Sequence, residues 1–199
     1  IAAAMVIAAA LGQIQLLFCF GALGLLSSII GVLVARVGKH GDPGKALNGG
    51  TYLTCGIFAA LTLAACLIWN YELRLWGAAI IGMLAGVAIG ITSDFFTGDD
   101  KMPVEKVAHA CQNGPAFTIL SGFSYGLLSS FPSLAGIGIA ALASYKLCEP
   151  LGSDYALLGI SVAAIGMLSI VGMIISNDAY GPIVDNARGV AEMGDLGED

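Results

Sequence analysis

Three acidic side chains recur at a spacing of seven residues near the end of the chain. They are Asp178, Asp185 and Glu192, in the segment NDAYGPIVDNARGVAEM at 177–193. Seven residues are almost two turns of an α-helix, so on one helix the carboxylates would form a stripe that drifts about 20° per step. Carboxylate oxygens are the ligands that hard divalent cations prefer. The spacing therefore predicts an acidic helix face, and acids of this kind at the end of a hydrophobic helix tend to mark a functional site.

A second group of acids lies near the middle of the chain and contains Asp94, Asp99, Asp100 and Glu105. Asp94 and Asp185 are both flanked by apolar, glycine or proline residues. Charge in such surroundings near a bilayer is expensive and tends to mark a functional site. We therefore expect these two acids to meet at one cation, and we expect Asp99 and Asp100 to be solvated loop acids.

The composition excludes an ordinary soluble domain. Hydrophobic residues make up 57% of the chain, charged residues only 11%, and the mean hydropathy is +0.87. A soluble domain carries about 25% charged residues. We expect an all-α, polytopic membrane helical bundle that contacts lipid. The five cysteines include no CxxC pair and the chain has no basic patch, which argues against a cysteine metal site and against nucleic-acid binding.

The apolar runs predict about five full transmembrane helices, preceded by the tail of another. A spanning helix needs about 20 apolar residues. Pro132 predicts either a kinked helix or a span with a bent entry segment, and Pro182 predicts a second kink, because proline removes a helical hydrogen bond. We treat the chain as one transmembrane region, with helices expected at 1–12 (partial), 14–35, 52–69, 76–97, 115–147 and 155–186.

The basic residues predict the orientation of these helices. Threading the loops alternately places six lysines and arginines on one side of the membrane and only two, Arg74 and Lys146, on the other. The side with more basic residues is normally cytoplasmic. Both acidic groups are then expected to face the cytoplasm. The six residues are Arg36, Lys39, Lys45, Lys101, Lys106 and Arg188.

Small residues predict where helices approach closely. Gly82, Gly86 and Gly90 recur at intervals of four, a pattern typical of tight packing between membrane helices. Gly122 and Gly126 repeat it more weakly. We assign no chemistry to these glycines. The chain opens on an apolar segment with no basic residues before it, and we interpret it as a piece of a longer protein.

The segment at 178–193 also resembles a known family. DAYGPIVDNARGVAEM is similar to the signature DAYGPIxDNAGGIAEM of the membrane-integral inorganic pyrophosphatases. Other stretches support the resemblance, in the same order as in the family. They are the GDPGKALNGGTY loop at 41–52, the segment at 92–97 with its following MPV at 102–104, the helix start at 114–126 and YALLGISVAAIGML at 155–168.

The resemblance implies an ion pump for protons or sodium, driven by hydrolysis of pyrophosphate. It implies a homodimer and a cytoplasmic Mg2+ site, with K+ as a further candidate activator. Asp185 matches a ligand of the substrate-bound Mg2+, and Asp94 matches an acidic residue near the same funnel. Asp178, Asn186 and Arg188 are expected around Asp185.

The sequence departs from the family pattern at two places. Asp94 replaces a glutamate, and Phe95 and Phe96 replace two tyrosines. Arg188 replaces a glycine, three residues after Asp185, and either contacts phosphate or pairs with Asp185 and holds it away from metal. Two alternatives to the pump therefore stay open. They are a secondary ion transporter with acids in broken helices and a non-catalytic, degenerate paralogue.

Overall fold

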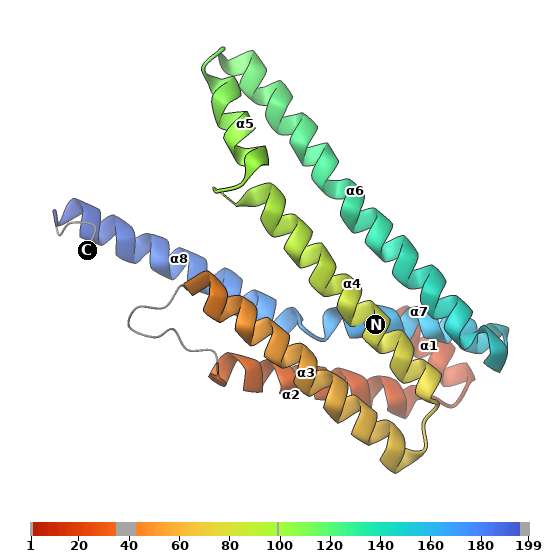
Figure 1. Cartoon of the computed structure of the whole chain (residues 1–199). Coiled ribbons are helices and arrows are strands. Elements are labelled where there is room, and N and C mark those ends of the chain that lie inside the picture. Colours follow the sequence, from red (N-terminus) through yellow and green to blue (C-terminus); the bar gives the residue numbers. More distant parts are fainter. Residues whose placement is uncertain (1, 35–42, 99, 196–199) are drawn as a thin grey trace. The chain divides into compact units, whose positions relative to one another are not determined.

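The computed structural model describes residues 2–34, 43–98 and 100–195. In this part of the chain all regular structure is helical, with eight α-helices, one 3-10 helix and no strand (Figure 1). Five helical segments of the described residues are long and apolar enough to cross a membrane. The predicted all-α membrane fold is therefore confirmed. Arg36, Lys39 and Asp99 lie outside the described residues.

The chain divides into two compact units. Unit 1 contains Ile1–Leu17 and Tyr71–Met167, and unit 2 contains Phe18–Asn70 and Leu168–Asp199. Each unit combines segments that are distant in the sequence.

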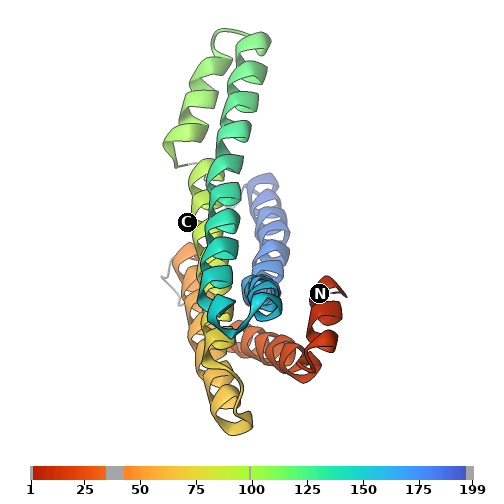
Figure 2. The same cartoon turned by 90° about the vertical axis from the view of Figure 1, so that its right-hand side faces the viewer.

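Unit 1 is organised around its longest helix, α6, which covers Pro115–Cys148. Helices α4 (Leu73–Thr97) and α5 (Met102–Cys111) follow each other along its side, as both views show (Figures 1 and 2). α6 continues as one helix through Pro132. A kink at Pro132 stays a prediction. The unit also contains α1 (Ala2–Ala10), a 3-10 turn (Glu149–Leu151) and most of α7 (Ser153–Leu168).

Helix α5 lies in a polar segment that the sequence predicted only as a connection. Pro103 stands in its first turn, where the missing amide costs no helical hydrogen bond. Val104, Val107 and Cys111 follow at helical spacing and line a groove shared with α6. Charged residues lie between these apolar positions, so the short apolar stripe was not recognised in the sequence.

The predicted glycine packing is found where α4 meets α7. A Cβ added at Gly82 would collide with the backbone of Ala163, and one added at Gly166 would collide with the backbone of Ala79. A Cβ at Gly86 would lie 3.2 Å from Met167, whereas one at Gly90 would meet nothing within 4 Å. The close approach is thus confirmed at the first two glycines of the pattern and does not extend to the third.

Unit 2 is built from most of α2 (Ile14–Val34), together with α3 (Pro43–Trp69) and α8 (Val171–Met193). Phe20 and Phe58 are fully buried and meet edge to face, with ring centroids 6.5 Å apart. Buried hydroxyls in α3 bond to their own helix, as Thr62 does with the carbonyl of Phe58 at 2.6 Å. Such internal bonds allow polar side chains to lie within an apolar helix bundle.

The final predicted helix, 155–186, is divided in two. α7 ends at Leu168 and α8 begins at Val171, with Ser169 and Ile170 between them. Ile170 has φ −93° and ψ 0°, which lies outside the helical range. The prediction of one continuous helix was therefore wrong at this point. Beyond the break, α8 runs without interruption through Pro182 to Met193, seven residues farther than expected.

Candidate metal-binding site

Helix α8 carries the predicted stripe of acids. Asp178, Asp185 and Glu192 lie on one uninterrupted α-helix, so their spacing of seven residues places them along one face. All three side chains are exposed. The face is therefore open to a ligand or to another part of the protein.

The spacing along α8 limits how these acids can act. A rise of 1.5 Å per residue separates successive members of the stripe by about 10 Å. Oxygen ligands bind Mg2+ at about 2.0–2.1 Å, so a single ion cannot bridge two of these short side chains. Among the described residues no three His, Cys, Asp or Glu side chains form a metal cluster. Asp185 can therefore supply one carboxylate ligand, with the others coming from elsewhere.

Arg188 lies one helical turn beyond Asp185 and is also exposed. The two side chains have the spacing at which helical ion pairs form. Within the described residues, however, the salt bridges present do not include a pair between them. The two interpretations of Arg188, contact with phosphate and pairing with Asp185, stay predictions. Asn186 follows Asp185 directly and is exposed as well.

Asp94 lies in the last turn of α4, where the main chain closes the helix. Its carbonyl accepts a hydrogen bond from the Gly98 amide at 2.8 Å, and its carboxylate is exposed. The carbonyl end of a helix carries a partial negative charge, so a carboxylate there is unfavourable unless a cation compensates. The last turn of α4 contains no basic residue. This placement supports a cation partner for Asp94.

Asp100 differs from Asp94 because it already has a partner. Lys101 donates a hydrogen bond to its carboxylate in the turn between α4 and α5. This bond lowers the pKa of the Asp100 carboxyl. Its exposure and its lysine partner agree with the expectation of a solvated loop acid.

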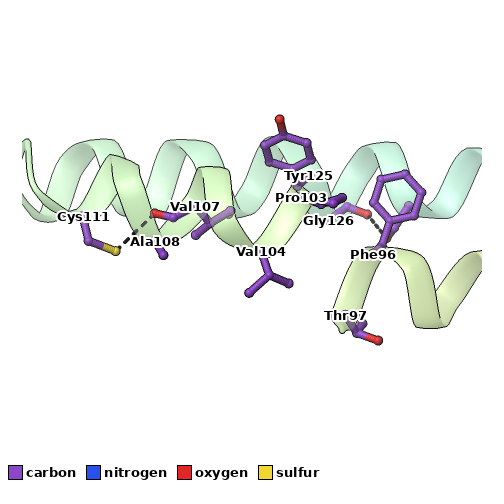
Figure 3. Close-up of a pocket in the computed structure, with 11 residues that line it drawn as sticks. Phe96, Thr97, Pro103, Val104, Val107, Ala108, Cys111, Tyr125 and Gly126 are labelled. Atoms are coloured by element: carbon purple, nitrogen blue, oxygen red, sulfur yellow. Dashed lines mark hydrogen bonds between the residues drawn. The ribbon is translucent and has the colours of Figure 1, made fainter. Parts of the chain in front are cut away.

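Phe95 and Phe96, which follow Asp94, stack edge to face with their ring centroids 5.3 Å apart. Phe96 borders a groove of about 420 Å³ formed by α4, α5 and α6 (Figure 3). No carboxylate lines this groove, so it is not the predicted metal site. Its walls are Phe96, Thr97, Pro103, Val104, Val107, Ala108, Cys111, Gly122, Tyr125, Gly126 and Ser129.

A neighbouring groove of about 490 Å³ between α4 and α6 is rich in hydroxyl groups, which the sequence interpretation missed. Several of them donate to their own helix, as Thr97 does to the Ser93 carbonyl at 3.0 Å and Ser129 to the Gly126 carbonyl at 2.7 Å. The signal was the cluster of serines inside an apolar span. The lining residues are Ser93, Phe96, Thr97, Ser129, Ser130, Ser133 and Leu134.

The predicted site residues fall into both units. Asp94 belongs to unit 1, whereas Asp178, Asp185, Asn186 and Arg188 belong to unit 2. Within unit 2 all four of these residues lie on helix α8. That Asp94 and Asp185 share one cation stays a prediction.

Comparison with known proteins gives one consistent result. The family model described as inorganic H+ pyrophosphatase matches residues 1–199. A protein of Clostridium tetani, provisionally named a K(+)-stimulated pyrophosphate-energized sodium pump, is 40% identical over 178 residues. These cover 87% of this chain and 26% of the relative.

Two further relatives are named as pumps for different ions. The K(+)-insensitive pyrophosphate-energized proton pump 2 of Moorella thermoacetica is 36% identical over 86% of this chain and 26% of its own length. The K(+)-stimulated pyrophosphate-energized sodium pump of Thermotoga maritima is 30% identical over 89% of this chain and 25% of its own length. The chain thus spans about a quarter of the length of these relatives. Together with the five apolar helices, they identify a multi-pass membrane protein.

Proposed function

Because the chain belongs to the inorganic H+ pyrophosphatase family, we propose that it forms part of an ion pump driven by hydrolysis of pyrophosphate. The observation that carries the proposal is the acidic helix α8. The stretch DAYGPIVDNARGVAEM, in which the family resemblance is strongest, is also the stretch that presents exposed carboxylates on one helix face. The pumped ion is a proton or sodium, since relatives of both kinds match.

Asp185 is proposed to be the carboxylate of α8 that holds Mg2+ with the bound substrate. Its exposed carboxylate and the distance of about 10 Å to the next acid suit a single ligand in a shared coordination sphere. Mg2+ is usually held by one or two carboxylates together with phosphate oxygens, so this donor set fits the ion. When bound, Mg2+ would neutralise phosphate charge and orient the phosphoryl group for attack by water.

The residues around Asp185 would prepare the same face for an anionic substrate. Arg188 places a permanent positive charge one turn away, suited to phosphate oxygens. Asn186 offers both a donor and an acceptor beside the ligand. Asp178 lies about 10 Å away along α8, too far to share the ion directly, and would position neighbouring groups. Asp94 is proposed as the acid contributed by α4.

The proposal includes the wider setting of the site. The excess of basic residues on one side supports a cytoplasmic orientation for Asp94 and Asp185. Large apolar side chains are exposed along α6, among them Phe123, Phe131 and Ile139, and would contact lipid or neighbouring helices. We propose a homodimer of the whole protein. K+ is proposed as an activator on the basis of relatives whose names state K+ stimulation.

Hydrolysis by the whole protein provides the test of the proposal. Membranes from a host without its own membrane pyrophosphatase should release phosphate from pyrophosphate once the protein is expressed. The release should require Mg2+ and should not occur with ATP. Membranes that bind Mg2+ and pyrophosphate but release no phosphate above the empty-vector control would instead support the degenerate paralogue.

Asp94 and Asp100 provide a matched pair for the role of α4. We expect Asp94→Asn to reduce phosphate release at least tenfold, because a neutral amide cannot compensate a cation. Asp100→Asn should retain nearly full activity, because Asp100 is paired with Lys101. Initial rates at saturating Mg2+ compare the two variants. Equal losses in both would remove Asp94 from the site.

Arg188 is tested by restoring the glycine of the family pattern. If Arg188 contacts phosphate, Arg188→Gly should raise the KM for magnesium pyrophosphate about three- to tenfold, and Arg188→Lys should fall in between. This change is smaller than the loss of a buried hydrogen bond to a charged group, because Arg188 is exposed to solvent and its interactions are screened. Tighter Mg2+ activation in Arg188→Gly would show instead that the arginine holds Asp185 away from metal.

A further inference from the structure

Four small residues form a tight contact at the start of α8. We call Gly24, Ser28, Ser169 and Gly172 the break contact, because it surrounds the interruption between α7 and α8. A Cβ added at Gly24 would lie 3.2 Å from the Cα of Ser169, and one added at Gly172 would lie 2.8 Å from the Cβ of Ser28. A side chain at Gly172 would force α2 and the start of α8 apart, whereas one at Gly24 requires a shift of only a few tenths of an ångström.

A buried hydrogen bond runs through the break contact. Ser28 Oγ donates to the carbonyl of Ser169 at 3.0 Å, across 141 residues of sequence. The Ser28 side chain is only 2% exposed and Ser169 only 6%. A helix interruption inside a membrane bundle places backbone carbonyls where water cannot reach them, so a hydroxyl donor there stabilises one geometry of the break.

The neighbouring Ser27 shows that this bond is a specific feature of Ser28. Ser27 is equally buried, but its hydroxyl donates to the Leu23 carbonyl of its own helix at 2.6 Å. Bonds of that kind satisfy the side chain without fixing a second element. The Ser28 hydroxyl, in contrast, links α2 to the segment from which α8 begins.

We infer that Ser28 is a positioning residue for the metal site, because it fixes the start of the helix that carries Asp185. This inference rests on the proposed function. Val171 begins α8 and Asp185 follows 14 residues later, about 21 Å along an uninterrupted helix. A shift or rotation at the start of this continuous helix changes the position of the side chains that follow, Asp185 beyond Pro182 included. Ligand geometry for Mg2+ tolerates little displacement, since the ion demands near-ideal octahedral coordination.

The test compares Ser28→Ala with Ser27→Ala in the whole protein. Ser28→Ala should raise the Mg2+ concentration for half-maximal pyrophosphate hydrolysis about three- to tenfold, with a smaller change in the rate at saturating Mg2+. Ser28→Cys, which keeps the shape and a weak donor, should show an intermediate shift. Ser27→Ala should leave Mg2+ activation unchanged. Both Ser27→Ala and Ser28→Ala should lower the melting temperature, and by similar amounts. Equal Mg2+ activation in all variants, or an equal shift in Ser27→Ala, would overturn the inference.

Cross-linking tests the same geometry without relying on activity. Cysteines at positions 24 and 169 should form a disulfide under mild oxidation, because the Cβ atoms would lie 3.2 Å apart, close to the 3.5–4.5 Å of disulfides. The control pair has cysteines at positions 21 and 169. It should not form a disulfide, because a Cβ at Gly21 would meet nothing within 4 Å. Mass spectrometry of linked peptides identifies the bond. Failure of the 24–169 pair overturns the break contact itself, whereas absent hydrolysis in the wild type overturns the proposed function alone.

Discussion

Replacing Asp185 by alanine is expected to abolish the Mg2+-dependent release of phosphate from pyrophosphate. The change removes the carboxylate of α8 that we propose as a metal ligand, and the neighbouring acids of the stripe lie too far along the helix to replace it. We expect a loss of at least a thousandfold in kcat/KM, corresponding to about 4 kcal/mol of transition-state stabilisation. Phosphate release from purified whole protein measures this loss.

Glu192 provides the matched control for this experiment. It lies on the same face of α8, one stripe position farther on, and is exposed at the end of the helix. Glu192→Ala should therefore retain most of the activity. Unchanged turnover in Asp185→Ala would exclude Asp185 as a ligand. A comparable loss in Glu192→Ala would indicate a general requirement for negative charge on this face.

Replacing Gly82 by alanine is expected to cause the largest loss of stability. A Cβ at this position would collide with the Ala163 backbone, and a backbone cannot move aside as a side-chain tip can. Helices α4 and α7 would have to separate, and overpacking of this kind costs about 1–3 kcal/mol or more. The thermal unfolding midpoint in detergent should fall by several degrees, and the yield of folded protein should fall with it.

Gly90→Ala controls for the effect of changing a glycine in the same helix. A Cβ there meets nothing within 4 Å, and alanine favours a helix by about 1 kcal/mol over glycine. Gly90→Ala should therefore leave the midpoint unchanged or raise it. If Gly82→Ala were as stable as wild type, the close crossing of α4 and α7 would be wrong.

Much of the fold was predictable because membrane helices leave a strong signal in composition. Long apolar runs predicted the membrane-spanning helical segments, although not α5 or the division between α7 and α8, and the spacing of Gly82 and Gly86 predicted a close helix contact. The acidic stripe was predictable for a similar reason, since helical periodicity needs only one element. Asp185 was distinguished from Asp178 by resemblance to a family, not by spacing.

The interruption at Ser169 and Ile170 could not be predicted in the same way. No proline marks it, and the apolar run continues through it without a polar residue other than Ser169 itself. Its geometry is stabilised by Ser28, which lies 141 residues earlier in the chain. A contact of that range leaves no local pattern. Helix α5 was missed for a different reason, because its apolar stripe is short and interleaved with charges.

The role that we infer for the break contact would connect the fold to the proposed metal site. Sequence reasoning treated α2 only as one more apolar span, although Ser27 and Ser28 are its only hydroxyl side chains. In the structure the Ser27 hydroxyl bonds within α2, whereas the Ser28 hydroxyl bonds to Ser169, just before α8 begins. Helix α2, which contains no acidic residue, would thus help to position Asp185, the proposed metal ligand.

Pyrophosphate-driven ion uptake tests the central claim most directly. The whole protein is reconstituted into sealed vesicles, with fluorescent reporters of internal pH and sodium. We predict that adding magnesium pyrophosphate to the outside produces proton or sodium uptake at a rate that follows phosphate release, and that both are lost together in Asp185→Ala. Ion uptake down a gradient without pyrophosphate, and unaffected by its addition, would contradict the account and identify a secondary transporter.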